Sequence, residues 1–246
     1  MARKHQSGAA EALDEIQSGA DRLAEWIREN GLLVAGSVAA LLVATSGISL
    51  WSGSRTEQEE EAAAALAAAR LEYLGAMGAS PNALDVPELA NPTAAAAIQA
   101  DFDAALSKVA ADFKGTTAEA LARFESARLD QQAGDLDAAL AGFESLAADA
   151  SVHPGLRGLA IQGAAQVLED RERWSEAADR HERAAALTGY PLRQWALADA
   201  ARCRTAARET ERALALYERL DAEAPDLRLP AAQRAQVREL RATVAR

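Results

Sequence analysis

The chain has 246 residues, half of them hydrophobic, and a formal net charge of −11. This charge, without any lysine- or arginine-rich block, would repel a phosphate backbone, so nucleic acid is excluded as an expected partner. The single cysteine, Cys203, excludes an intrachain disulfide framework. Much of the apolar content is alanine, which favours helices and lets them approach closely. The sequence therefore predicts an all-α protein.

Residues 1–30 predict a cytoplasmic leader that contains a short amphipathic helix. Apolar residues recur there at alternating steps of three and four, which places them on one stripe of a helix. The members of this stripe are Leu13, Ile16, Ala20, Leu23 and Ile27. The mixed-sign polar face favours a short helix near the membrane over a basic lipid-binding helix.

Residues 31–51 predict a transmembrane helix. These 21 residues carry no charge, and as a helix they span about 31 Å, close to the roughly 30 Å hydrocarbon thickness of a bilayer. Trp26 and Trp51 lie at a spacing that suits the two interfacial aromatic belts. A buried soluble helix and a cleaved signal peptide are the alternatives, although a 30-residue leader is long for a signal peptide.

Basic residues near the predicted span indicate its orientation. Arg22 and Arg28 precede it closely, whereas Arg55 alone follows it closely. Cytoplasmic flanks carry the excess of Lys and Arg. This bias favours a cytoplasmic N-terminus, with the long C-terminal part across the membrane.

Residues 52–115 predict a helical hairpin after the membrane. Residues 57–78 read as one long helix, and the loop 79–92 holds three of the seven prolines. Asn91 and Pro92 are suited to the N-cap and first turn of the next helix.

Residues 116–246 show an internal period. Thr116 and Glu119 form a capping box that opens the first helix of this part. Small and bulky residues then recur at intervals of 38 and 36, as expected for helices that cross closely at the small residues while a larger side chain fills the gap to the next hairpin. The repeated packing positions are Ala127, Ala165 and Ala201; Ala139, Ala177 and Ala213; and Phe143, His181 and Tyr217.

These positions resemble the tetratricopeptide repeat family, whose motif has two small residues, an aromatic residue and a proline, the last matched by Pro225. The resemblance implies a helical-hairpin solenoid, closed by a C-terminal capping helix that begins at Pro230. It also implies a protein-binding face on the first helix of each repeat. Carried over to this sequence, that face comprises Phe124, Arg128, Gln131, Gln162, Gln166, Glu169, Trp195 and Arg202.

No motif points to catalysis. The histidines His5, His153 and His181 lie far apart in sequence, and paired-cysteine metal spacing, a glycine-rich phosphate loop and a nucleophile elbow are missing. We therefore expect neither an enzyme nor a cofactor, a metal site or a small-molecule substrate.

Three segments carry a further resemblance: AEWIRENG before the span, EEEAAAALAAA after it, and FKGTTAEALARFESARLDQQAGDLDAAL in the repeats. This arrangement is similar to the ancillary SecYEG translocon subunits, the YfgM-like proteins. The resemblance implies a single-pass protein of the bacterial inner membrane. Its periplasmic repeats would associate with the SecYEG translocon and with periplasmic chaperones, and help pass emerging clients between them. The alternatives are a structural scaffold of another cell-envelope complex and a cytoplasm-facing adaptor of inverted topology.

Overall fold

The computed structural model describes residues 55–81, 86–87 and 89–244. By its internal contacts the chain divides into two compact units, Met1–Glu57 and Gln58–Arg246, and the second holds every helix from α3 onward. The predicted leader at 1–30 and the predicted span at 31–51 lie outside the described residues. Among the residues that are described, no helix combines the length and the apolar character needed to cross a bilayer.

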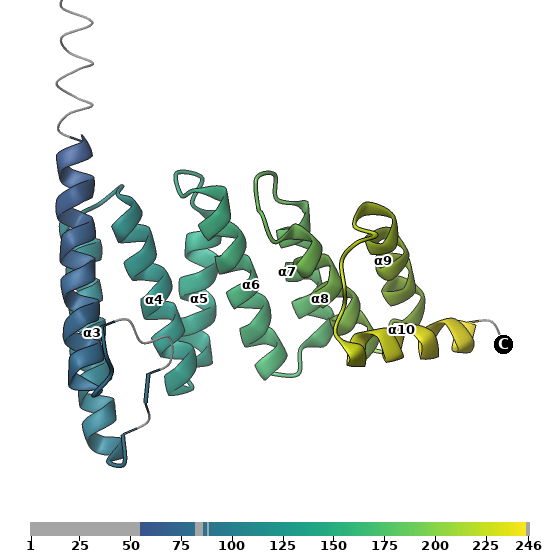
Figure 1. The fold of residues 1–246 in the computed structure, drawn as a ribbon, viewed down its shortest axis with the longest axis horizontal. Coiled ribbons are helices and arrows are strands. Elements are labelled where there is room, and N and C mark those ends of the chain that lie inside the picture. Colours follow the sequence, from purple (N-terminus) through teal and green to yellow (C-terminus); the bar gives the residue numbers. More distant parts are fainter. Residues whose placement is uncertain (1–54, 82–85, 88, 245–246) are drawn as a thin grey trace, which may run out of the picture. The chain divides into compact units, whose positions relative to one another are not determined.

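The described part of the chain is an all-α array of nine helices, which confirms the predicted fold class of this part (Figure 1). Each helix packs against the next along the chain, so the array is a series of antiparallel hairpins. The first helix covers residues 55–76. It is followed by α3 (Pro92–Asp112), α4 (Thr117–Ala133), α5 (Leu136–Ala148), α6 (Pro154–Asp170), α7 (Trp174–Ala186), α8 (Arg193–Ala206), α9 (Thr210–Glu223) and α10 (Ala231–Val244).

Two helix starts follow the predicted capping residues. The Asn91 side chain accepts hydrogen bonds from the backbone N–H groups of Thr93 and Ala94, and Pro92 occupies the first turn of α3. At α4, the Thr116 hydroxyl accepts from the Glu119 N–H at 3.1 Å. The Glu119 carboxylate accepts in return from the N–H of Gly115 at 2.8 Å, one residue earlier than a capping box expects.

The turn inside each repeat hairpin uses one backbone conformation at one repeat position. Gly134, Glu172 and Arg208 all have positive φ angles, of 83°, 57° and 63°. They follow one another at the same intervals of 38 and 36 as the packing residues. Glycine adopts this left-handed conformation without steric cost, and of the three turns only the first has glycine at this position.

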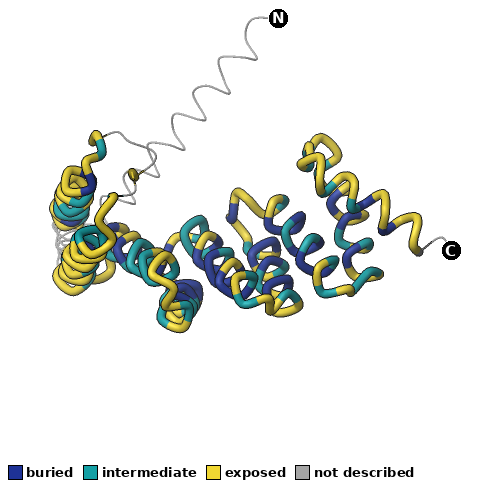
Figure 2. Tube along the Cα trace, turned by 90° about the horizontal axis from the view of Figure 1, so that it is seen from below, coloured by how far each residue is buried: buried dark blue, intermediate teal, exposed yellow. Residues whose placement is uncertain are grey.

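The main core lies between the hairpins from α4 to α10, and alanines fill much of it. Figure 2 shows the buried residues concentrated along α4 to α9, whereas α10 is mostly exposed. Because alanine side chains are short, neighbouring helices approach closely and the larger side chains must enter specific gaps. At one such gap, a Cβ added to Gly163 of α6 would lie 2.7 Å from the Phe143 ring of α5.

Candidate protein-binding face

The first helices of the three repeats, α4, α6 and α8, carry a row of exposed apolar side chains. The row consists of Leu121, Leu159 and Trp195, which are 38%, 39% and 41% exposed. Each lies six residues before the packing alanine of its helix, so all three occupy the same repeat position. Large apolar side chains exposed at one position of successive helices mark a candidate interaction surface. We call these three residues the apolar row.

A second row lies two turns further along the same helices. Arg128, Gln166 and Arg202 each follow a member of the apolar row by seven residues, a spacing that keeps both rows on one helix face. Gln166 is exposed. Arg128 donates to the Glu125 carboxylate at 3.1 Å. We call these three residues the polar row, and the two rows together with the groove described next form the first-helix face.

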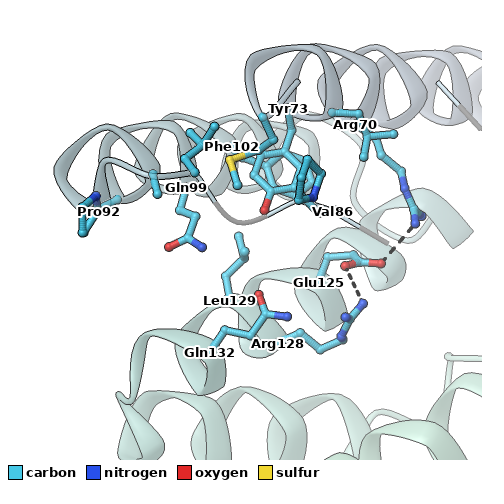
Figure 3. Close-up of a pocket in the computed structure, with 16 residues that line it drawn as sticks. Arg70, Tyr73, Val86, Pro92, Gln99, Phe102, Glu125, Arg128, Leu129 and Gln132 are labelled. Atoms are coloured by element: carbon cyan, nitrogen blue, oxygen red, sulfur yellow. Dashed lines mark hydrogen bonds and ion pairs between the residues drawn. The ribbon is translucent and has the colours of Figure 1, made fainter. Parts of the chain in front are cut away.

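A groove of about 690 Å³ opens on this face beside α4 (Figure 3). Its α4 wall is formed by Glu125, Arg128 and Gln132, which continue the stripe that begins at Leu121. Its apolar lining comes from the helix at 55–76 and the turn that follows it, from α3, from α4 and from the described part of the predicted 79–92 loop. The main apolar residues are Tyr73, Leu74, Met77, Val86, Phe102 and Leu129.

The rings of Tyr73 and Phe102 stack at this groove, with centroids 4.4 Å apart. At the α4 side, the Glu125 carboxylate lies between two arginines. The guanidinium group of Arg70, which belongs to the helix at 55–76, is 3.8 Å from it, and that of Arg128 is 3.1 Å from it. The side chains of Arg70 and Arg128 are 63% and 46% exposed, so they can also bind a carboxylate presented by a ligand.

The remaining residues of the predicted face make contacts within the chain. Phe124 packs edge-on against Phe143, with ring centroids 5.5 Å apart. Gln131 donates to the Asp170 carboxylate at 2.8 Å. The Gln162 side chain accepts a hydrogen bond from the Tyr190 hydroxyl. These three side chains therefore connect neighbouring helices, and they are less available to a partner than the apolar row.

Glu169 and Arg202, also predicted for this face, form a mutual ion pair. The two guanidinium NH₂ groups of Arg202 lie 2.8 Å from the two carboxylate oxygens of Glu169, and the Nε group of Arg202 donates to Asp199 at 3.4 Å. Arg202 is thus occupied by carboxylates of its own chain. Of the two arginines in the polar row, Arg128 is the more available to a ligand.

Two further side chains converge on Glu169. The Nε2 atom of His181 lies 2.8 Å from Oε1 of Glu169, and the Cys203 thiol donates to the same oxygen at 3.3 Å. Burial alone would raise the pKa of Glu169, but hydrogen bonds from His181 and Arg202, together with the Arg202 charge, lower it from 4.5 to about 2. Burial raises the pKa of the Cys203 thiol. The sequence did not indicate this cluster, because its members come from α6, α7 and α8.

The predicted packing residues lie in the interior of the array. All nine of them are at most 2% exposed: Ala127, Ala139, Phe143, Ala165, Ala177, His181, Ala201, Ala213 and Tyr217. His181 combines this burial with the contact to Glu169. The sequence pattern missed Leu121 and Leu159, although both share a repeat position with Trp195, and comparing that position across the three repeats would have found them.

The fold and this face define a helical-hairpin repeat protein that presents a binding surface on its first helices. Residues 24–187 match the tetratricopeptide repeat-like domain. The chain belongs to this family, which agrees with the resemblance found in the sequence.

Two solved structures are similar to the chain. Both are crystal structures of nearly identical TPR-like repeats from a Podosopora anserina protein assigned as a kinesin light chain, the second with the substitution Q17M. The first has 19% identity and a TM-score of 0.46, and the match covers 59% of this chain and 78% of that one. The second has 18% identity and a TM-score of 0.44, with 61% and 86% covered. No curated protein matches the chain.

Proposed function

We propose that this protein is a membrane-anchored interaction module that holds apolar segments of other proteins on its first-helix face. The observation that carries this proposal is the apolar row. Leu121, Leu159 and Trp195 expose apolar surface at the same position of three successive helices. A helix face that contacts only water usually carries polar side chains. A ligand with apolar side chains would cover the apolar row, and the burial of this surface would contribute to the free energy of binding.

The groove beside α4 extends the same surface. Its stacked Tyr73 and Phe102 rings offer aromatic contact, and Arg70 and Arg128 at its edge offer charge-assisted hydrogen bonds. A client segment would place apolar side chains along the row and in the groove, with a carboxylate near the two arginines. Recognition would then depend on a few anchors and tolerate varied sequences between them.

The setting of this module is proposed from the sequence. The uncharged stretch at 31–51 would anchor the chain in the bacterial inner membrane, with the repeats in the periplasm. The resemblance to the ancillary SecYEG translocon subunits supports a place beside the translocon. There the first-helix face would receive emerging clients and help pass them to periplasmic chaperones.

Affinity capture of the full-length protein in mild detergent tests this setting. We expect translocon subunits and secreted clients to be captured with the wild-type protein. The double substitution Leu159→Ser and Trp195→Ser should lose the clients and keep the translocon, because it alters the face and not the anchor. Capture of a different, fixed set of envelope proteins by both versions would instead indicate a structural scaffold.

A phosphatase fusion after Arg246 tests the orientation. The reporter is active in the periplasm, so the proposal requires an active fusion. An inactive fusion that is expressed at the same level would support a cytoplasm-facing adaptor and contradict the periplasmic setting.

A further inference from the structure

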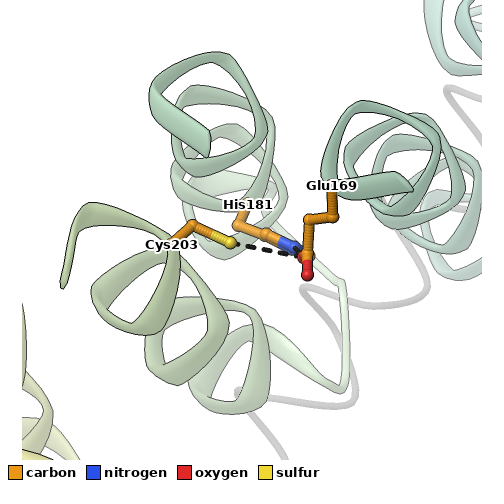
Figure 4. A group of neighbouring side chains, drawn as sticks. All are labelled: Glu169, His181 and Cys203. Atoms are coloured by element: carbon orange, nitrogen blue, oxygen red, sulfur yellow. Dashed lines mark hydrogen bonds and ion pairs between the residues drawn. The ribbon is translucent and has the colours of Figure 1, made fainter. Parts of the chain in front are cut away.

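The side chains of Glu169, His181 and Cys203 bring three metal-binding atoms together from three successive helices (Figure 4). A carboxylate oxygen, an imidazole nitrogen and a sulfur all lie within 4.8 Å of one another. Oε1 of Glu169 is the centre of the group, at 2.8 Å from Nε2 of His181 and 3.3 Å from Sγ of Cys203. Cysteine sulfur, histidine nitrogen and carboxylate oxygen are the atoms that bind Zn²⁺ in proteins, and imidazole and thiolate also bind other transition-metal ions.

We propose that Glu169, His181 and Cys203 form a three-ligand site for a transition-metal ion such as Zn²⁺. Bonds of about 2.0 to 2.3 Å in tetrahedral geometry place ligand atoms roughly 3.3 to 3.7 Å apart. The contact between Nε2 of His181 and Oε1 is shorter than this by about half an ångström, and the contact between Sγ of Cys203 and Oε1 lies at the short end of the range. Because all three ligand atoms lie within 4.8 Å of one another, side-chain movements of about an ångström suffice. Three protein ligands leave a fourth position open for water or another ligand.

The ion takes the place of two protons. In the metal-free protein, one proton links Cys203 to Oε1, and another links Nε2 of His181 to the same oxygen when Nε2 carries it. On binding, the thiol proton leaves to solvent and the imidazole proton moves to Nδ1. Nδ1 of His181 is buried and has no hydrogen-bond partner among the described residues. It is an unpaired acceptor before the ion binds and an unpaired donor afterwards. Metal binding therefore leaves the number of unpaired nitrogens in the His181 ring unchanged.

The neighbouring charges suit a divalent ion. With the ion in place, its two positive charges and that of Arg202 face the carboxylates of Glu169 and Asp199 and the Cys203 thiolate. Three positive charges are thus balanced by three negative ones. Arg202 gives up its contact with Oε1 and keeps the one with Oε2, where it orients the ligating carboxylate as outer-shell partners of metal ligands do.

The ion would enter from the side of Glu169. His181 is 1% exposed and Cys203 is fully buried, whereas the Glu169 side chain is 15% exposed. Because the ligands come from α6, α7 and α8, binding would fasten the second repeat to the third and raise the stability of the folded chain.

A cobalt titration of the full-length protein tests the site. The chain is purified in detergent without a polyhistidine tag, reduced, freed of metal with a chelator and titrated with Co²⁺. We expect a thiolate-to-cobalt charge-transfer absorption that saturates at one ion per chain and disappears on addition of Zn²⁺. Because Cys203 is the single cysteine of the sequence, this absorption can come from no other residue. Its absence in the wild-type protein at saturating Co²⁺ would overturn the proposal.

Variants and a thermal measurement provide the controls. Cys203→Ser and His181→Asn should abolish the cobalt absorption, while His5→Asn should leave it intact. Zn²⁺ should raise the unfolding temperature of the wild-type protein and leave that of Cys203→Ser unchanged. An equal rise in both proteins would show that the stabilising ion binds elsewhere, and would refute the site.

Discussion

The two junctions between the three repeats use the same positions with different chemistry. At the first, Phe143 of α5 is buried against Gly163 of α6 and edge-on to Phe124. At the second, the matching position is occupied by His181 of α7, which is equally buried but forms a hydrogen bond with Glu169. The repeat thus requires a ring of a certain volume at this position. It tolerates a polar ring where a neighbouring helix supplies a partner, since a buried polar group without one is costly.

The largest expected effect is at the apolar junction. Phe143→Ala removes a ring that is 1% exposed and leaves a cavity against Gly163. We expect the free energy of unfolding to fall by about 3 to 5 kcal/mol, measured by chemical denaturation. A loss below about 1 kcal/mol would show that the neighbouring helices close the gap, and that this ring does not determine the packing.

The polar junction depends on one carboxylate. Glu169→Leu deprives His181, Arg202 and Cys203 of their shared acceptor, and should cost about 2 to 4 kcal/mol. Gln131→Leu is the matched control, because Gln131 occupies the same repeat position and makes an exposed hydrogen bond to Asp170. It should cost less than about 0.5 kcal/mol. Equal costs for both substitutions would contradict the difference between the junctions.

Acid should weaken the polar junction selectively. The pKa of Glu169 is lowered from 4.5 to about 2 in the folded protein, so its contribution is complete above pH 4.5 and is lost as the pH falls toward 2. We expect this loss to amount to about 2 to 3 kcal/mol. Glu169→Gln should be less stable at neutral pH and lose less stability over this acid range. Parallel pH profiles for the variant and the wild type would contradict the assignment.

The smallest expected effect concerns the turns. Arg208 has the left-handed conformation that Gly134 adopts at the matching turn of the first repeat. Arg208→Gly should therefore stabilise the chain by up to about 1 kcal/mol, because glycine has no Cβ to clash in this conformation. Thermal unfolding measures the change, with Ala215→Gly at an exposed position in the interior of α9 as a control that should destabilise by a similar amount.

The sequence was sufficient for the helical repeats and for several of their helix ends. The alanine positions and the rings at 143, 181 and 217 indicated the hairpins, while Asn91 and Thr116 marked two helix starts. These features are local or periodic, and so a single sequence reveals them. The predicted domain limits stay predictions.

The candidate site was less predictable, because it depends on contacts between helices. Cys203 occupies the repeat position of Leu129 and Val167, so the sequence presents it as a packing residue. Its contact with Glu169 joins side chains that are 34 residues apart. Likewise, the groove beside α4 arises where the helix at 55–76, α3 and α4 meet, and no single segment carries its pattern.

Photocrosslinking in cells tests the central claim most directly. A photoreactive amino acid placed at position 159, in the apolar row, should capture newly secreted proteins, whereas the same amino acid at the exposed position 183 of α7 should capture few or none. Equal capture of secreted proteins from both positions, or capture from position 183 alone, would contradict a client-binding role for the first-helix face.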